Sequence, residues 1–310
     1  MDGLLYIFAR TLIAVIQTLP LAWVAHLGRV GGALFYWLDA PHRRAARRNL
    51  RKAFPEKSKR EIRALSAENF KRIGENFACA AKTAAMTDEE IKGILEVSGI
   101  EKFRQQNASQ PPPSRVFAIG HFGNFELHAR CAIFAPEYRF ATTYRGLRQP
   151  SLNRLMQSLR EKSGCLFFER RSDGDALKAA MNQGGILLGL LADQHAGDKG
   201  LRLPFFGRDC STSSAPAVFA LRYHCPLFTA FCYRTALGRW RVEVGDEIPT
   251  HANGHPRPIA DIMLEVNRAF EAAVRRDPAN WFWVHNRWKP GKWRNRDASL
   301  NAPAISGTGT

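Results

Sequence analysis

The residues with the clearest chemical potential in this sequence are His121 and Glu126, which lie five positions apart. An apolar run ends at Gly120, His121 follows, and Gly123-Asn124 precedes the acid. An imidazole can take a proton from a hydroxyl group, and a carboxylate bonded to its other nitrogen stabilises the imidazolium that forms. Such general-base catalysis contributes roughly 10²–10⁴-fold to a rate. The pattern predicts a general base, His121, with Glu126 as its carboxylate partner.

This H-x4-E spacing sets a condition on the local structure. Residues five apart on one continuous α-helix point about 140° apart. We therefore expect His121 in a turn, formed by Gly123-Asn124, and Glu126 in the first turn of the helix that follows. The spacing alone is weakly specific, because nine histidines and 28 acidic residues make one chance match unsurprising. A histidine with a purely structural role is the alternative.

The elements that must position these side chains follow from the hydrophobic periodicity. After residue 114, apolar runs alternate with helical patterns. Strands are expected at 116–119, 140–144, 165–168, 186–192, 227–233 and 240–244, and helices at 125–134, 151–163, 174–182, 211–223 and 259–276. Repeated strand–helix units predict an α/β fold with a largely parallel sheet covered on both faces. Before them, residues 41–85 are expected to be helical, with a capping box at Ser58 and Glu61.

The polar residues at the strand ends are expected to meet in one crevice. In open α/β sheets, ligands bind outside the carboxyl ends of the strands. Those ends carry His121, Arg145, Arg170-Arg171 and Asp193. Guanidinium groups suit phosphate oxygens. Asn124, or backbone N–H groups near it, is placed to stabilise an oxyanion. Because no nucleophile precedes the histidine, we expect a deprotonated hydroxyl group to attack an activated acyl carbonyl directly.

Other chemistries have little support. The candidate metal ligands His121, Glu126, His128, Asp193 and His195 lack the spacing of known sites, so no metal is expected. The sequence has no G-x-S-x-G, Walker A or G-x-G-x-x-G motif, so neither serine hydrolysis nor a nucleotide cofactor is predicted. The six cysteines form no C-x-x-C pair and are interpreted as reduced core thiols of a cytosolic compartment.

Charge and hydropathy indicate contact with anionic surfaces. The 45 basic and 28 acidic residues give a net charge of +17, which attracts phosphates of lipids or nucleic acids and acidic proteins. The first 40 residues are rich in apolar side chains, but charged and polar residues and a proline interrupt the stretch. This pattern favours an interfacial or weakly spanning membrane anchor over a core helix. Residues 42–60 then hold nine Lys or Arg and one acid. Such a cluster binds an anionic cytoplasmic leaflet at about 1 kcal/mol per basic side chain; a solvated helix face is the alternative.

These patterns divide the chain into three parts. Residues 1–40 are expected to associate with the membrane. Residues 41–296 form one domain, with a helical part at 41–114 and an α/β part at 115–296. Residues 297–310 are small and polar and are predicted to be a disordered tail.

Several short motifs occur in a fixed order along nearly the whole chain. They are Asn49-Leu50 with Ala53-Phe54-Pro55-Glu56, Gly120-His121-Phe122-Gly123-Asn124-Phe125-Glu126, Tyr144-Arg145 with Asn153, Arg171, Ala192-Asp193-Gln194, Pro204-Phe205-Phe206-Gly207 with Thr212, and Trp283-Val284-His285-Asn286-Arg287-Trp288-Lys289. This set resembles the bacterial lipid A late acyltransferase family, the HtrB/LpxL-like lysophospholipid acyltransferases. Together the ordered motifs are far more specific than any one of them.

The resemblance implies a glycerolphosphate-acyltransferase-like fold and an activity. A fatty acyl chain would move from acyl carrier protein to a hydroxyl group of a membrane glycolipid, a lipid A precursor, on the cytoplasmic side of the bacterial inner membrane. His121 would be the catalytic base and Glu126 its partner. The implied substrate-binding or site-organising residues are Asn124, Arg145, Arg170, Arg171, Asp193 and Gln194. The basic surface would then meet an acidic carrier protein and anionic head groups.

Two alternatives remain at this stage. The acceptor could be a lysophospholipid or another glycolipid, because His195 stands where many lipid A enzymes carry another residue. A different class of protein, a basic non-catalytic membrane- or nucleic-acid-binding module, would use Trp281, Trp283 and Trp288 to stack bases. Packing is the more common role of such tryptophans, so no nucleic acid partner is expected.

Overall fold

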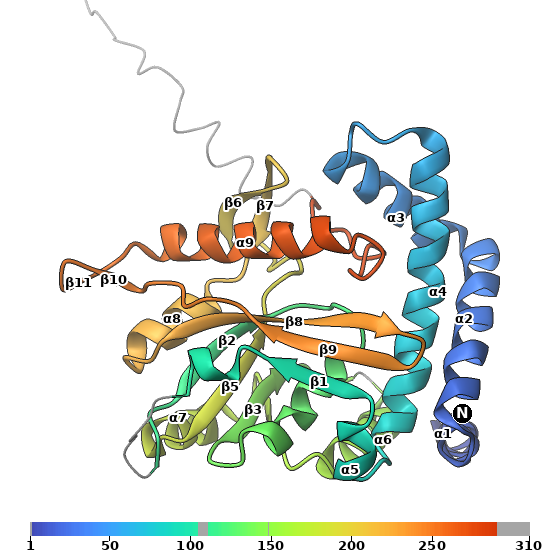
Figure 1. Ribbon diagram of the computed structural model, residues 1–310, viewed down its shortest axis with the longest axis horizontal. Coiled ribbons are helices and arrows are strands. Elements are labelled where there is room, and N and C mark those ends of the chain that lie inside the picture. Colours follow the sequence, from blue (N-terminus) through green and yellow to red (C-terminus); the bar gives the residue numbers. More distant parts are fainter. Residues whose placement is uncertain (1, 105–110, 148, 290–310) are drawn as a thin grey trace, which may run out of the picture.

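The molecule is built on one mixed sheet of seven strands (Figure 1). The structure is a computed structural model that describes residues 2–104, 111–147 and 149–289. The strand order is β1 (Leu95–Ser98), β9 (Arg239–Val244), β8 (Leu227–Ala236), β2 (Arg115–Ile119), β5 (Ile186–Leu191), β3 (Arg139–Tyr144) and β4 (Leu166–Glu169). Every pair is parallel except the β8–β9 hairpin. The predicted α/β fold with a mostly parallel sheet is confirmed.

Both faces of the central strands are buried, as their continuous apolar runs predict. Val116 and Ala118 of β2 belong to one core cluster, and Phe117 and Ile119 to the other. The first cluster includes residues of α7 (Gly174–Gln183), α8 (Ala215–Arg222) and α9 (Ile259–Arg276). The second includes residues of α5 (Asp88–Lys92), the 3₁₀ helix η2 (Phe125–Phe134) and the segment after η1 (Ile100–Lys102). The alternation of β2 thus joins two helical layers through one sheet.

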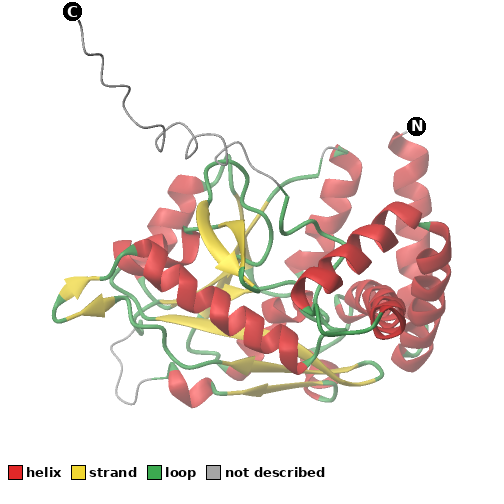
Figure 2. Cartoon of the chain, turned by 90° about the horizontal axis from the view of Figure 1, so that it is seen from above, coloured by secondary structure: helices red, strands yellow, loops and turns green. Residues whose placement is uncertain are grey.

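The first four helices of the chain stand beside the sheet (Figures 1 and 2). They are α1 (Asp2–Thr18), α2 (Leu21–Leu38), α3 (Ala40–Ala53) and α4 (Lys59–Thr83). The predicted capping box is present at the start of α4. The Glu61 backbone N–H donates to Ser58 Oγ at 3.2 Å, and the Ser58 backbone N–H donates to the Glu61 carboxylate at 2.8 Å. The first helix ends before Pro20 and the second begins after it, because proline lacks the backbone N–H that a continuous helix needs.

Glycines allow α2 to approach α4 very closely. A Cβ atom on Gly32 would lie 2.1 Å from the Phe70 carbonyl oxygen, and one on Gly74 would lie 2.1 Å from the Gly28 carbonyl oxygen. These distances leave no room for a side chain at either glycine, where the two helices cross. Residues 21–38 are therefore packed into the body of the protein, although the opposite face of the same helix is apolar and exposed.

The exposed apolar face spans both of the first two helices. Its large exposed side chains are Leu4, Leu5, Ile7, Phe8, Leu12, Val15, Trp23, Leu27, Val30, Leu34, Phe35, Trp37 and Leu38. A contiguous apolar surface of this kind marks an interaction site on a folded protein. Among the described residues, no helix combines the length and hydropathy that a membrane span requires.

One part of the predicted secondary structure is wrong. Residues 211–223 were expected to form one helix, but Ser211 and Thr212 belong to β7 (Arg208–Thr212), which pairs with β6 (Leu201–Phe205). The turn between these strands has φ angles of +51° at Phe206 and +66° at Gly207, as tight hairpins require. The remaining elements are α6 (Pro150–Glu161), β10 (His251–Ala252) and β11 (His255–Pro256). The predicted tail at 297–310 lies outside the described residues.

Candidate active site

His121 and Asp193 meet because their strands are neighbours in the sheet. Parallel β2 and β5 place Ile119 opposite Leu191, so the chain two residues further on brings His121 beside Asp193. The imidazole Nδ1 lies 2.8 Å from Asp193 Oδ1, and the backbone N–H of His121 donates to Oδ2 at 2.9 Å. One carboxylate therefore fixes both the ring and the backbone of this histidine.

Asp193 is held in turn by an indole group. Its side chain is fully buried, and Oδ2 also accepts a hydrogen bond of 2.8 Å from Trp281 Nε1. Burial by itself raises the pKa of the Asp193 carboxyl, but the charge of His121 and the hydrogen bonds from His121 and Trp281 outweigh it. The pKa of this carboxyl consequently lies below its ordinary value. An ionised carboxylate on Nδ1 leaves Nε2 as the proton-accepting nitrogen.

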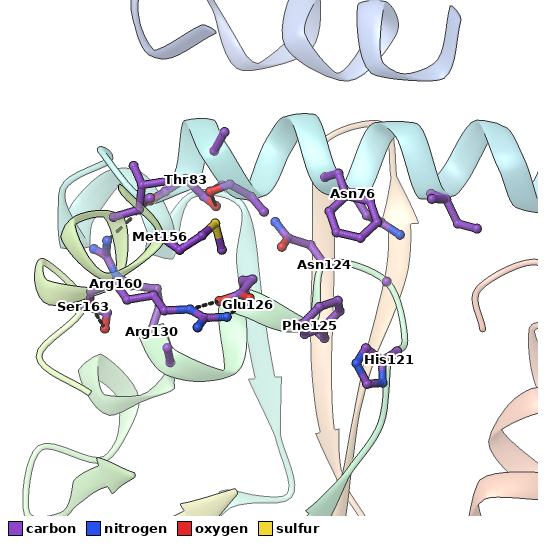
Figure 3. Close-up of a pocket in the computed structure, with 18 of the residues that line it drawn as sticks. Asn76, Thr83, His121, Asn124, Phe125, Glu126, Arg130, Met156, Arg160 and Ser163 are labelled. Carbon is purple, nitrogen blue, oxygen red and sulfur yellow. Dashed lines mark hydrogen bonds and ion pairs between the residues drawn. The ribbon is translucent and has the colours of Figure 1, made fainter. Parts of the chain in front are cut away.

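Glu126 does not bond to His121, so the predicted partnership is wrong. Its two carboxylate oxygens accept hydrogen bonds of 2.7 and 3.2 Å from Arg160 on α6. Figure 3 shows Glu126 pointing toward Arg160, with Phe125 between it and His121. The reason is local: Gly123 turns the chain with a φ of +53°, and η2 then begins with the tighter winding of a 3₁₀ helix.

The imidazole of His121 faces two cavities. Its side chain is 18% exposed, and the described part of the chain gives Nε2 no hydrogen-bond partner. A larger cavity of about 700 Å³ and a smaller one of about 270 Å³ are both lined by His121, Phe125, Glu126 and Arg160. His121 thus lies where the two spaces meet.

The larger cavity has a polar mouth and an apolar interior. At the mouth lie Arg145 and Arg170, each one residue past its strand, together with Gln194. Of the residues predicted to converge on His121, Arg145 and Arg170 line the same cavity as the imidazole. The apolar interior is lined mainly by the side chains Val97, Ile100, Phe103, Phe117, Ile119, Phe140, Leu187, Leu191, Val242 and Val244. Arg171 is exposed and does not line this cavity.

The smaller cavity contains an unusual polar group. Asn124 is only 1% exposed, and neither atom of its side-chain amide has a hydrogen-bond partner among the described residues. Asn124 and His121 both line the smaller cavity, and the Asn124 side chain lies on the side of α4 (Figure 3). A buried amide without partners costs free energy. Such a cost is typical of a group that meets its partner only when a ligand binds.

A C-terminal segment without regular structure closes the back of the site. Two asparagines hold its backbone: Asn49 of α3 donates to the carbonyl oxygens of Trp283 and His285 at 2.9 and 2.8 Å. Asn69 of α4 does the same for Ala279 and Trp281, at 2.9 and 2.6 Å. Asn69 therefore positions Trp281, the donor to Asp193, and Asn49 holds the backbone that follows it.

His285 and Arg287 complete this segment, and sequence reasoning gave neither a role. His285 Nε2 accepts a hydrogen bond of 2.9 Å from the His195 backbone N–H. Burial, the largest influence, lowers the pKa of His285 to about 4 against the opposing effect of Asp193. Arg287 is fully buried and donates to the Gln194 carbonyl and the Thr212 hydroxyl, each at 2.9 Å. The only sequence signal for these residues was the ordered motif that ends the described chain.

This arrangement suits proton transfer from a hydroxyl group next to an acyl carbonyl. It combines a base with a buried carboxylate, an unpartnered amide and two apolar spaces. Among the described residues, no three His, Cys, Asp or Glu side chains are grouped so that they could hold a metal ion. All six cysteines are free, and five of them are buried.

Comparisons with known proteins agree with this chemistry. The family model described as bacterial lipid A biosynthesis acyltransferase matches residues 4–290. A lipid A biosynthesis palmitoleoyltransferase of Escherichia coli is 24% identical over 283 residues, which cover 87% of this chain and 86% of the relative. A lipid A biosynthesis acyltransferase of Haemophilus influenzae is 24% identical over 280 residues, covering 88% and 86%.

Proposed function

Because the chain belongs to the bacterial lipid A biosynthesis acyltransferase family and is an acyltransferase, we propose that it acylates a hydroxyl group of a lipid A precursor. The acyl donor is the thioester of acyl carrier protein, and His121 is the general base. The observation that carries this proposal is the His121–Asp193 pair at the junction of two cavities. The glycerolphosphate-acyltransferase-like fold belongs to the same proposal.

The reaction is a direct transfer in two steps. His121 Nε2 takes the proton of the acceptor hydroxyl as its oxygen attacks the thioester carbonyl carbon. The negative charge of the tetrahedral intermediate falls on the former carbonyl oxygen, where Asn124 Nδ2 is available to donate. The C–S bond then breaks, and the imidazolium returns the proton to the leaving thiolate. Asp193 stabilises the imidazolium between these steps.

The larger cavity fits the donor. Its apolar interior accommodates a fatty acyl chain, and Arg145 and Arg170 at its mouth suit the phosphate of the carrier's prosthetic arm or of the acceptor. Gln194 lies beside them. Arg171 follows Arg170 in the sequence and is exposed, and it is proposed as a second contact for the same anionic groups. No cofactor takes part.

The surface supports a place at the cytoplasmic face of the bacterial inner membrane. The apolar face of α1 and α2 would sit in the lipid surface, and the basic residues of α3 would meet anionic head groups. Acyl carrier protein is acidic, so the net charge of +17 also favours its approach. Replacing Trp37 and Leu34 with Ser should reduce co-sedimentation with anionic vesicles, whereas unchanged sedimentation would contradict this placement.

Acyl transfer can be tested directly. The purified chain, acyl carrier protein thioesters and a lipid A precursor in detergent micelles are combined, and the product is identified by mass spectrometry. We expect one added acyl chain with the wild type and none with His121→Ala at equal folded content. Equal product from the two proteins would overturn the role of His121, and no product with the wild type would overturn the function.

A further inference from the structure

The two cavities that share His121 differ in shape, walls and surroundings. A donor thioester accounts for the larger one, with its arginine mouth and apolar depth. The smaller cavity has no assigned occupant. We propose that this smaller cavity is a binding subsite for a hydrocarbon chain of the acceptor lipid, so that the enzyme recognises a chain of the acceptor next to the hydroxyl group it acylates. This inference rests on the proposed function.

The walls of the smaller cavity are those of a chain-binding site. They come from three helices, with Ile13 of α1, Ile73 and Ala80 of α4 and Leu159 of α6 among them. Small side chains on α4 make the space: Ala80, Ala81 and Ala84 all line it. Apolar walls of this kind favour a saturated chain over a sugar or a phosphate group, which would lose its hydration without gaining partners.

An ion pair separates this cavity from the larger one. Glu126 and Arg160 line both spaces, and their side chains are only 25% and 20% exposed. The Arg160 guanidinium also lies over the rings of Tyr144 and Phe167, 5.8 and 5.1 Å from their centroids. The pair is therefore held on several sides. Two apolar chains placed on either side of it would stay apart, with their reacting ends together at His121.

Helix α1 both lines the smaller cavity and belongs to the surface proposed to face the membrane. Ile13 lines the cavity, while Phe8, Leu12 and Val15 of the same helix expose their side chains to the exterior. A lipid held at the outer face of α1 thus has a short apolar path to the active site. This arrangement favours a membrane-resident acceptor over a soluble donor as the occupant. Asn124 and His121 line this same cavity, so a chain bound in it lies within the space that both residues border (Figure 3).

Filling the cavity from α4 tests the inference. Ala80→Leu places a larger side chain in it while preserving helix propensity. We expect the KM for a lipid A precursor to rise about tenfold or more, as for the loss of two or more buried methylene groups. The donor chain-length preference, measured with acyl carrier protein thioesters of different length, should not change. Ala84→Leu at the end of α4 provides a second variant if the first folds poorly.

Two controls make the result specific. Ala64→Leu changes an exposed position of the same helix and should leave both quantities unchanged. Val97→Phe adds bulk to the apolar wall of the larger cavity only, and it should shift the donor preference to shorter chains without raising the acceptor KM. A shift in donor preference with Ala80→Leu, or no effect of either α4 variant on the acceptor, would overturn the assignment.

Binding without donor separates this inference from the proposed function. Binding of a radiolabelled lipid A precursor in micelles to the full-length chain needs no acyl transfer. If the wild type transfers no acyl chain, the proposed function fails. The subsite still stands if Ala80→Leu weakens this binding about tenfold and Ala64→Leu does not, and it falls if both bind like the wild type.

Discussion

The Asp193 carboxylate forms hydrogen bonds with two atoms of His121, the ring Nδ1 at 2.8 Å and the backbone N at 2.9 Å. The two residues lie 72 positions apart in the sequence, yet the pairing of β2 with β5 makes them neighbours. Because the same carboxylate also accepts from Trp281, its orientation is fixed before any substrate arrives. The proposed base, His121, is therefore held in place by the sheet and by the C-terminal segment together.

Asp193→Asn tests this relationship. The amide removes the negative charge and can present an N–H to Nδ1, which would put the imidazole proton on Nε2 and block it as a base. We expect kcat to fall about 10²–10⁴-fold while the melting temperature changes far less than activity does. Activity close to that of the wild type would show that another group orients His121.

The Glu126–Arg160 pair is tested by a double-mutant cycle on kcat/KM. Arg160→Gln removes both hydrogen-bond donors of the pair, and Glu126→Gln removes one acceptor together with the negative charge, so the double variant should be little worse than Arg160→Gln alone. Residues in contact show coupling of about 0.5–3 kcal/mol. The matched cycle of Glu126→Gln with Asp193→Asn should be closer to additive. Strong coupling in this second cycle alone would restore Glu126 as the partner of the base.

His285 predicts a pH dependence of stability. Its folded pKa of about 4 lies below its ordinary value of 6.5, so the unfolded chain binds more protons between these values. The stabilising contribution of neutral His285 is complete above pH 6.5 and is lost as the pH falls through about 4. Urea unfolding should therefore show falling stability across this window. His285→Gln keeps an acceptor for the His195 N–H but cannot titrate. In this variant the free energy of unfolding should depend less steeply on pH, because unfolding takes up a fraction of one proton fewer.

The close approach of α2 and α4 offers a test with a control in the same helix. Gly32→Ala should destabilise the protein by about 1–3 kcal/mol, because its Cβ would collide with the Phe70 backbone. Gly31 has nothing within 4 Å of its Cβ position, so Gly31→Ala should stabilise by about 0.5–1 kcal/mol through helix propensity. Denaturant midpoints compare them. Equal effects of the two would mean that α2 does not pack as described.

The sequence was most informative where periodicity is regular. Six strands of the main sheet, all after residue 114, follow from their apolar runs and α9 from its helical spacing, and the strand-end rule brought His121 and Asp193 to one crevice. The hairpin β6–β7 was missed because its tight turn uses Phe206-Gly207, a dipeptide without the usual asparagine or aspartate signal.

The error at Glu126 has a physical source. Spacing in the sequence suggested a carboxylate near the imidazole, but direction depends on whether the first turn winds as an α or a 3₁₀ helix, which spacing does not encode. Trp281 and His285 were beyond prediction for another reason. Their segment has no regular structure, and its path depends on Asn49 and Asn69, more than 200 positions earlier.

The pairing of β2 with β5 also makes the proposed activity depend on the register of these two strands. A slip of one residue between these strands would turn His121 and Asp193 to opposite faces of the sheet. Such a molecule would still bury two apolar strands and look folded to a spectrometer. Only the correctly registered sheet brings the proposed base and its carboxylate together, so we expect specific activity per folded molecule to follow the fraction of chains whose strands are aligned.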